Sequence, residues 1–478
     1  MWQSSVEHLF SSFFSRSHVL KLAPHLYLQR MNDQLTQREL QSLAYIAPPK
    51  QLGAFSGLDD SDDEEEGGNY VLHVRTALLE VKKGAITAIG EMAAHSGAAF
   101  VPFLEQVMQV LQKAASNWHP LIKCEVSVAL PSLIMPSVEA NHGGEINWTK
   151  GDLAGANPMH PHTQALVGAV LTELIMLMKD DDKSTVGKAC EGIQTVIETC
   201  GPHALLPVAN DCLQNTHELL TKAAPCLAAE EMYGELPEDD DDHDVVMQAA
   251  CDLVGGFGRV MGTQFAQYLP QFLPAICNYA KSSRPPSDRS MAVGCLSELA
   301  QELEGSIFDH WQGVFLPASV AGLNDADENV KRNAAFCAGV CCEHLGDRIA
   351  GDYAQILQAI SPMFSIDVNA ASTGGFESAA ACVDNAAAAV ARMIMASPNS
   401  VPMAQVLPAL LSALPLKTDM TENETVYKCV LGLLQMNHPE IVSRKADVKR
   451  IFTAAVAEDS KVEDEVKAQL QAALPGLQ

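Results

Sequence analysis

Aromatic residues, strand patterns and catalytic motifs are all scarce in this sequence. Phe, Trp and Tyr make up 6% of the 478 residues, and no run alternates Val, Ile or Thr between hairpin turns, which excludes a β-rich fold. No Gly-Lys-Ser/Thr phosphate loop, Gly-x-Ser-x-Gly elbow or His-Glu-x-x-His pair is present. We therefore predict that the protein is not an enzyme and uses no cofactor.

The 13 cysteines form no framework, because none is spaced as Cys-x-x-Cys. Cys337, Cys341 and His344 share one helical stripe, but a metal site would need a fourth ligand, so we interpret them as core residues and predict no metal. Scattered cysteines in apolar stretches indicate reduced thiols in the cytoplasm or nucleus.

A signal peptide and a membrane-spanning segment are also missing from the pattern. The start of the chain lacks a basic region followed by a sustained apolar run, and the most apolar stretch, 166–178, is short and contains Glu173. The sequence thus predicts a soluble protein without membrane insertion.

Positive charge is in short supply, with 31 Lys and Arg against 59 Asp and Glu and a net charge of −28. This excess repels nucleic-acid phosphate and anionic lipid and favours basic partners, so we predict no direct nucleic-acid binding. Two acidic runs stand out, at 59–66 and 238–244. Each is either a solvated spacer or a mobile anionic segment that captures basic cargo.

What the sequence has in quantity is a repeated helical hairpin. A small-residue helix ends at a Gly or Pro turn, and a second helix opens near a Leu-Pro pair, at 94–104, 199–207, 260–270, 303–317 and 396–408. Helix pairs that recur every 40–60 residues or so are typical of helical solenoids. We predict an all-α, HEAT-repeat α-solenoid, a superhelical stack of antiparallel helix pairs.

The predicted organisation has three parts. Residues 1–50 are irregular and could hold a degenerate helical repeat, and residues 51–69 are expected to be an acidic flexible linker. The HEAT-repeat array follows at 70–478, with a loop insert near 137–160 and an acidic loop near 230–244.

Several hairpins resemble a known family. Residues 327–336, 384–394 and 406–419 are similar to HEAT repeats of the importin-β (karyopherin-β) superfamily. An acidic run followed by 74–85 is similar to the importin-4 and importin-5 subgroup. The match covers about 70–455 and resembles the C-terminal half of such proteins, which are about twice as long as this chain.

The resemblance implies a nuclear transport receptor that carries basic cargo, such as histones or ribosomal proteins with nuclear localisation segments, through the nuclear pore. It implies contacts with nucleoporin Phe-Gly repeats, and shuttling between cytoplasm and nucleus by way of pores in the nuclear envelope. The Ran-GTP site, which lies in the N-terminal half of such receptors, is expected to be absent from this chain. The alternative is a HEAT-repeat scaffold or regulatory subunit of an intracellular complex.

Acidic and amide side chains are the candidate cargo contacts, because they pair with Lys and Arg of a basic segment. Asp384, Asn385, Glu422 and Glu424 lie near helix starts late in the array, where capping a helix is the alternative role. Trp118, Trp311 and Asn333 are expected to join neighbouring repeats rather than meet cargo. The acidic runs supply the other candidates: Asp59, Asp60, Asp62, Asp63, Glu64, Glu65, Glu66, Asp239, Asp240, Asp241 and Asp242.

Overall fold

The computed structural model describes residues 64–117, 119–153, 158–228, 241–368, 375–457 and 460–477. These residues form helices and connecting turns, with no strand among them, and they divide into two units, Met1–Val260 and Met261–Gln478. The predicted all-α class is confirmed.

Unit 1 consists of helices that pair in antiparallel hairpins. They are α5 (Glu64–Ser96), η2 (Gly97–Phe103), α6 (Leu104–Ala115), α7 (Pro120–Ser132), α8 (Ile134–His142), α9 (Pro161–Leu177), α10 (Lys183–Cys200), α11 (Pro202–Leu205), η3 (Leu206–Val208), α12 (Ala209–Leu220) and α14 (Asp241–Met261), which ends at the unit boundary.

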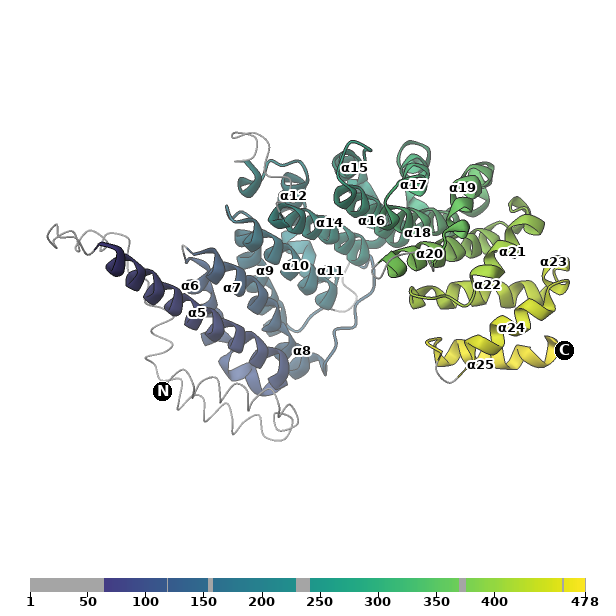
Figure 1. Cartoon of the computed structure of the whole chain (residues 1–478). Helices are drawn as coiled ribbons and strands as arrows, with labels where there is room; N and C mark the ends of the chain where they lie inside the picture. Colours follow the sequence, from purple (N-terminus) through teal and green to yellow (C-terminus); the bar gives the residue numbers. More distant parts are fainter. Residues whose placement is uncertain are drawn as a thin grey trace. The chain divides into compact units, whose positions relative to one another are not determined.

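Unit 1 has two helical layers. In the first layer α5, α7 and α10 lie side by side, and in the second α9 contacts both α6 and α12 (Figure 1). The buried face of α10 carries Val186, Ile193 and Ile197 at helical spacing, which explains why this segment forms an amphipathic helix against its neighbours.

Unit 2 repeats the same construction. Its elements are η4 (Gly262–Tyr268), α15 (Leu269–Tyr279), α16 (Pro286–Leu303), η5 (Glu304–His310), η6 (Trp311–Phe315), α17 (Leu316–Leu323), α18 (Glu328–Leu345), η7 (Gly346–Asp352), α19 (Tyr353–Ile360), η8 (Ser361–Ser365), α20 (Gly375–Ala396), η9 (Pro398–Ser400), α21 (Met403–Ala413), η10 (Met420–Glu422), α22 (Asn423–Gln435), α23 (Pro439–Val442), α24 (Lys445–Ala455), α25 (Asp464–Ala473) and η11 (Leu474–Leu477).

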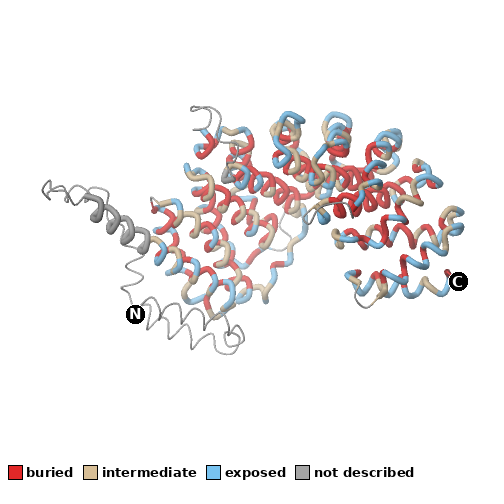
Figure 2. The backbone as a smooth tube through the Cα atoms, viewed as in Figure 1, coloured by how far each residue is buried: buried red, intermediate tan, exposed pale blue. Residues whose placement is uncertain are grey.

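The first helices of the unit 2 hairpins, α16, α18, α20 and α22, form one layer in sequence order, and α15, α17, α19 and α21 form the other (Figure 1). Figure 2 shows the contrast in burial, since α18 and α20 are largely buried while the second layer exposes its outer turns. Every residue of α20 from Ala379 to Ile394 is buried, and small side chains allow that, because its run of Ala lets neighbouring backbones approach closely.

The hairpin turn has a common backbone geometry. Gly97, Gly262 and Gly346 begin seven-residue 3₁₀ segments with φ of 56°, 56° and 50°. Glu304 occupies the equivalent position before Gly305 with φ of 53°, a conformation that favours glycine. The recurrent Gly of the sequence pattern is therefore explained by its positive φ.

Helix starts differ from the expected boundaries at both acidic runs. The first helix begins at Glu64, so residues 64–69 are helical where a linker was expected, and α14 begins at Asp241 within the expected acidic loop. The insert begins after His142, because α8 extends into its expected range. The expectation for residues 1–50 lies outside the described residues.

Two described stretches, Pro120–His142 and Gly375–Ala396, are long and apolar enough to cross a membrane by length and composition. In the structure 56% and 89% of their most apolar windows are buried, so both form core helices of the stack.

Candidate partner-binding surfaces

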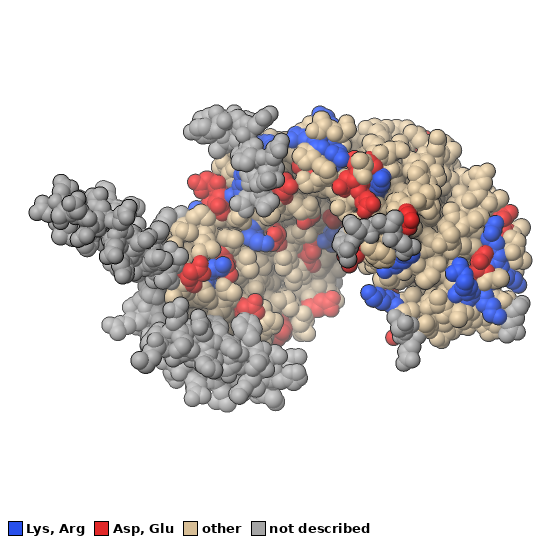
Figure 3. Space-filling view, viewed as in Figure 1, with Lys and Arg blue, Asp and Glu red and all other residues tan. Residues whose placement is uncertain are grey.

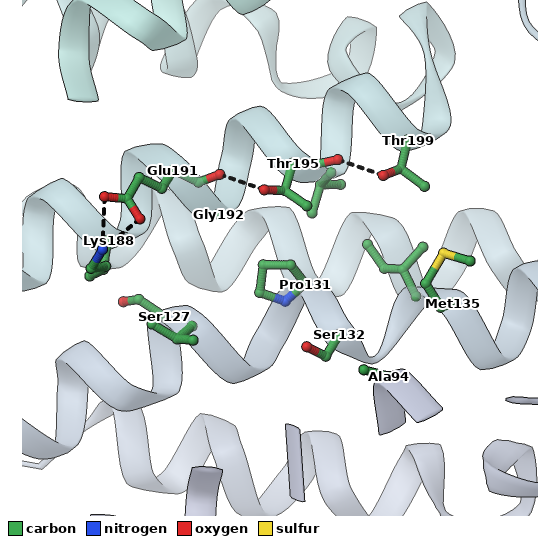
Figure 4. Close-up of a pocket in the computed structure, with 13 residues that line it drawn as sticks. Ala94, Ser127, Pro131, Ser132, Met135, Lys188, Glu191, Gly192, Thr195 and Thr199 are labelled. Carbon is green, nitrogen blue, oxygen red and sulfur yellow. Dashed lines mark hydrogen bonds and ion pairs between the residues drawn. The ribbon is translucent and has the colours of Figure 1, made fainter. Parts of the chain in front are cut away.

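A groove lies between α7 and α10 in unit 1. Its volume is about 290 Å³, and its wall includes Val128, Pro131, Met135 and Thr195 (Figure 4). Val128 is 51% exposed and gives this wall an accessible apolar side chain. The groove thus offers an apolar floor that is open to solvent.

The rim of this groove is polar but internally satisfied. The Lys188 ammonium pairs with the Glu191 carboxylate at 2.7 Å, and the hydroxyls of Thr195 and Thr199 donate to backbone carbonyls one turn earlier at 2.9 and 2.7 Å (Figure 4). An occupant of the groove would therefore be held by apolar contact rather than by unpaired charge.

Gly192 brings the two walls of the groove together. A Cβ atom at this position would lie 3.1 Å from the backbone oxygen of Ser127 and 3.2 Å from the Pro131 ring. The absence of a side chain lets α10 approach α7 closely at this point.

Asp384 is fully buried and binds the loop between α21 and α22. Its carboxylate accepts backbone N–H groups of Lys417, Thr418 and Asp419 at 2.7 to 3.2 Å and the Thr418 hydroxyl at 3.1 Å. Asn385, 2% exposed, donates to the Asp419 carboxylate at 2.9 Å. The prediction that this pair contacts cargo is wrong, because both side chains are buried and used within the chain.

Glu422 is also buried, and its partner is Arg392. The Arg392 Nη2 donates to Glu422 Oε1 at 3.2 Å, and Nη1 lies 2.8 Å from Oε2 without hydrogen-bond alignment. Arg392 Nε donates to Glu343 at 3.0 Å, so one guanidinium connects α18, α20 and the start of α22. The cargo prediction for Glu422 is therefore also wrong.

Further ion pairs join repeats in unit 2. Arg289 makes a bidentate pair with Asp325, with both N–O distances 2.7 Å, and its hydrogen bonds hold the pKa of the Asp325 carboxyl below its ordinary value. Burial would raise the pKa of Asp419, but hydrogen bonds from Thr421 and Asn385 and the charge of Arg332 outweigh it and lower that pKa. These carboxylates are thereby stabilised in their ionised form.

The remaining predicted cargo residues have different positions. Glu424 is exposed and pairs with Lys428 one turn later at 2.5 Å, so it stays a candidate. Asp59, Asp60, Asp62, Asp63, Asp239 and Asp240 lie outside the described residues, and the structure describes the backbone but not the side chains of Glu64, Glu65, Glu66, Asp241 and Asp242.

The residues expected to join repeats do so where they are described. Trp311 is 1% exposed and donates to the Asp352 carboxylate at 2.7 Å, and Asn333 donates to the Ser290 backbone oxygen at 2.9 Å on the neighbouring α16. Trp118 lies outside the described residues. Cys337 and Cys341 are buried, and among the described residues no cluster of His, Cys, Asp and Glu could hold a metal ion.

Sequence reasoning missed the α7–α10 groove and the role of Arg392. The signal for the groove was the pair of helix-disfavoured residues, Pro131 within α7 and Gly192 within α10, which mark a close helix crossing. Arg392, a lone base in an alanine-rich apolar helix, was the signal for a buried acidic partner.

No family model matches the chain. Among curated proteins it is 26% identical over 426 residues to the probable importin subunit beta-4 of Schizosaccharomyces pombe, covering 86% of this chain and 38% of that protein. Importin-4 of Homo sapiens is 26% identical over 405 residues, covering 83% and 35%. The chain thus spans well under half the length of the curated relatives that it matches.

Solved structures show the same fold. The karyopherin Kap121p bound to the SUMO protease Ulp1p matches 98% of this chain and 44% of its own, with a TM-score of 0.65 at 15% identity. Kap121p bound to RanGTP matches 99% and 44%, with a TM-score of 0.63 at 15% identity. Together with the curated relatives, these structures confirm the HEAT-repeat solenoid class and the importin-4-like resemblance.

Proposed function

Because this chain belongs to the importin-β superfamily, we propose that it holds protein cargo for transport into the nucleus. The observation that carries the proposal is its 26% identity over 86% of the chain to an importin subunit, together with the HEAT-repeat fold. We propose further that the chain corresponds to the C-terminal half of such receptors and performs no catalysis.

Basic segments are the proposed cargo, of the kind found in histones and ribosomal proteins. The net charge of −28 supports this choice, because it favours fast, salt-sensitive association with Lys- and Arg-rich segments. The acidic residues of 59–66 and 239–242, together with Glu424, are the proposed contacts.

The α7–α10 groove is the proposed contact for nucleoporin Phe-Gly repeats. An aromatic side chain fits an apolar depression of about 290 Å³ that contains the exposed Val128. Kap121p has been solved bound to Nup53p, which makes nucleoporin contact a property of a structural neighbour. Cargo and pore contacts would give this chain a shuttling distribution between cytoplasm and nucleus, passing the nuclear envelope at pores.

A pull-down tests the proposal with three immobilised probes: a histone-tail peptide, Phe-Gly repeats and Ran-GTP. We expect the first two to retain the chain and Ran-GTP not to retain it. Binding to neither the peptide nor the repeats would contradict the transport function and favour a scaffold.

Two variants sharpen the groove assignment. Val128→Glu is expected to abolish retention on Phe-Gly repeats, because it places a charge on the apolar floor. Met176→Glu adds the same charge at a 66% exposed position on α9, outside the residues lining the groove, and is expected to behave as wild type. Equal losses in both variants would contradict the assignment of the groove.

For the acidic run, one variant replaces the acids of 59–66 by Asn and Gln, and a second keeps them in shuffled order. If the run captures cargo, only the neutral variant will bind the histone-tail peptide more weakly, and its affinity will depend less on salt concentration. An unchanged salt dependence would make the run a spacer.

A further inference from the structure

A short segment near the C-terminal end of unit 2, residues 444–450, has a net positive charge in an acidic chain. Between residues 444 and 450 stand Arg444, Lys445, Lys449 and Arg450 with a single acid, Asp447, in a chain whose net charge is −28. Figure 3 shows basic side chains gathered over this end of unit 2. We call these four residues the α24 basic surface.

Helix geometry directs this surface toward solvent. Val448, Ile451, Phe452 and Ala455 repeat at helical spacing on the buried face of α24. Lys449 and Arg450 fall on the exposed side of the same helix. The apolar face thus anchors the helix while Lys449 and Arg450 remain accessible, and Arg444 and Lys445 beside them are half-buried.

These bases form no ion pair among the described residues, unlike most arginines of unit 2. Arg284, Arg289, Arg332 and Arg392 each pair with a carboxylate, and Arg348 stacks on Phe308 at 3.7 Å.

Among the described residues, Arg444, Lys449 and Arg450 have no carboxylate within ion-pair distance. Lys445 donates only to the backbone oxygen of Gly476, at 3.4 Å, and the buried Nε of Arg444 has no acceptor among the described residues. Unpaired bases are unexpected in a chain with almost twice as many acids as bases.

The acids of the neighbouring helix lie at the far end of α24. The hydrogen bond from Lys445 to the Gly476 backbone oxygen places the end of η11 beside the start of α24. At the other end of α24, the Ser460 hydroxyl donates to the Ala455 backbone oxygen, and the Ser460 backbone oxygen accepts from Lys467. The acidic first turn of α25, with Asp464 and Glu465, is therefore near the end of α24. The basic surface is thus separated from these acids along the helix.

We propose that the α24 basic surface binds a short acidic segment of a protein partner. From Lys445 to Arg450 the helix rises about 8 Å, a distance that two or three residues of an extended peptide span. The 39% exposed Val442, two residues before Arg444, adds an apolar contact for a hydrophobic residue beside the acids. This partner chemistry is opposite to that of the proposed basic cargo.

A peptide fits better than a nucleic acid. A short segment interacts within a screening length of about 8 Å at physiological salt, so it meets mainly the local positive charge. A long polyanion extends beyond the patch and meets the field of a chain with net charge −28.

Fluorescence anisotropy of a labelled peptide with the sequence of residues 57–68 tests the proposal on the full chain at physiological salt. We expect binding that weakens about tenfold or more in the Lys449→Glu/Arg450→Glu variant, since two attractions become repulsions. The matched control, Lys113→Glu/Lys179→Glu, changes two exposed bases of unit 1 by the same charge and is expected to bind as wild type.

Three outcomes would overturn the proposal: no binding by wild type, equal weakening in both variants, or tighter α24-dependent binding of a 20-nucleotide single strand than of the peptide. Circular dichroism checks that the α24 variant remains folded. Retention of the variant on the histone-tail peptide separates this proposal from the cargo function.

A last arm identifies the source of the acidic segment. Neutralising the acids of 59–66 in the chain itself is expected to leave binding of the added peptide unchanged, and stronger binding would overturn the assignment to a partner, because that run would then occupy the basic surface in cis. Unchanged binding would assign the surface to a separate partner protein.

Discussion

Both units connect neighbouring repeats by ion pairs, and the most deeply buried pair lies in unit 2. In unit 2 the most deeply buried pair, Arg392 with Glu422, is 8% and 6% exposed. In unit 1 the pair Arg259 with Glu198, between α14 and α10, is 38% and 30% exposed, whereas Lys123 with Asp180 is 14% and 12% exposed. Unit 1 also leaves a solvent-open groove between α7 and α10.

This difference shows how one repeat can serve two purposes. A buried charge is stable only beside its partner, so the buried pairs of unit 2 fix the relative positions of α18, α20 and α22. Exposed pairs contribute little, because solvent screens their attraction. We infer that unit 2 holds its repeats in one register, while unit 1 offers a surface between repeats.

The largest expected effect comes from Arg392→Ala, which leaves Glu422 buried without its partner. We expect a loss of about 3–5 kcal/mol in the stability of this part of unit 2, measured by hydrogen exchange of the α20 amides. Arg259→Ala, its counterpart in unit 1, is expected to cost about 1 kcal/mol, because its carboxylate partner remains partly solvated. Equal losses would remove the distinction between the units.

Glycine-to-alanine substitutions test how closely the helices approach in each unit. At Gly339 a Cβ would lie 2.7 Å from the Ala389 backbone, whereas at Gly192 the nearest atoms are at 3.1 Å. We expect Gly339→Ala to destabilise unit 2 by about 2 kcal/mol and Gly192→Ala to be nearly neutral, because helix propensity offsets the smaller crowding. Thermal unfolding of the two variants gives the comparison, and the reverse order would contradict it.

The Arg289–Asp325 pair predicts a pH dependence of stability. The pKa of Asp325 is lowered in the folded state, so the pair stabilises the fold above the unfolded pKa of about 3.9 and loses this contribution as the pH falls through the lower, folded pKa. At pH 7 we expect Asp325→Asn to cost about 1.5 kcal/mol, since it removes a charge-assisted bidentate bond. Urea unfolding should show this difference shrinking below about pH 4, and a constant difference would contradict the assignment.

The smallest effect is expected at the turn that both units share. Glu304 adopts the positive φ that glycine adopts at Gly97, Gly262 and Gly346. Glu304→Gly should stabilise unit 2 by up to about 1 kcal/mol, because the relief of backbone strain exceeds the added entropy of the unfolded chain. Gly346→Ala is the control that should destabilise, and calorimetry compares the two.

Much of the fold was predictable because helices and turns depend on local sequence. The hairpin turns predicted at 94–104 and 260–270 agree with η2 at Gly97–Phe103 and η4 at Gly262–Tyr268. The predicted cargo role of Asp384 was wrong for a physical reason. Asp384 lies within α20, which begins at Gly375, and not at a helix start. An acid within a helix is compatible both with solvent and with a backbone partner more than thirty residues away, and only packing decides between them.

The sequence by itself determined the helical repeat, the Gly turns and the family resemblance, because each depends on residues close together in the chain. It also contained the basic segment 444–450. Only the packing of α25 against α24 decided that these bases have no acidic partner among the described residues. Tertiary structure alone decided which acids are buried, which arginines they meet and where a groove remains. These properties depend on distances between helices separated by tens of residues, which a linear pattern does not encode.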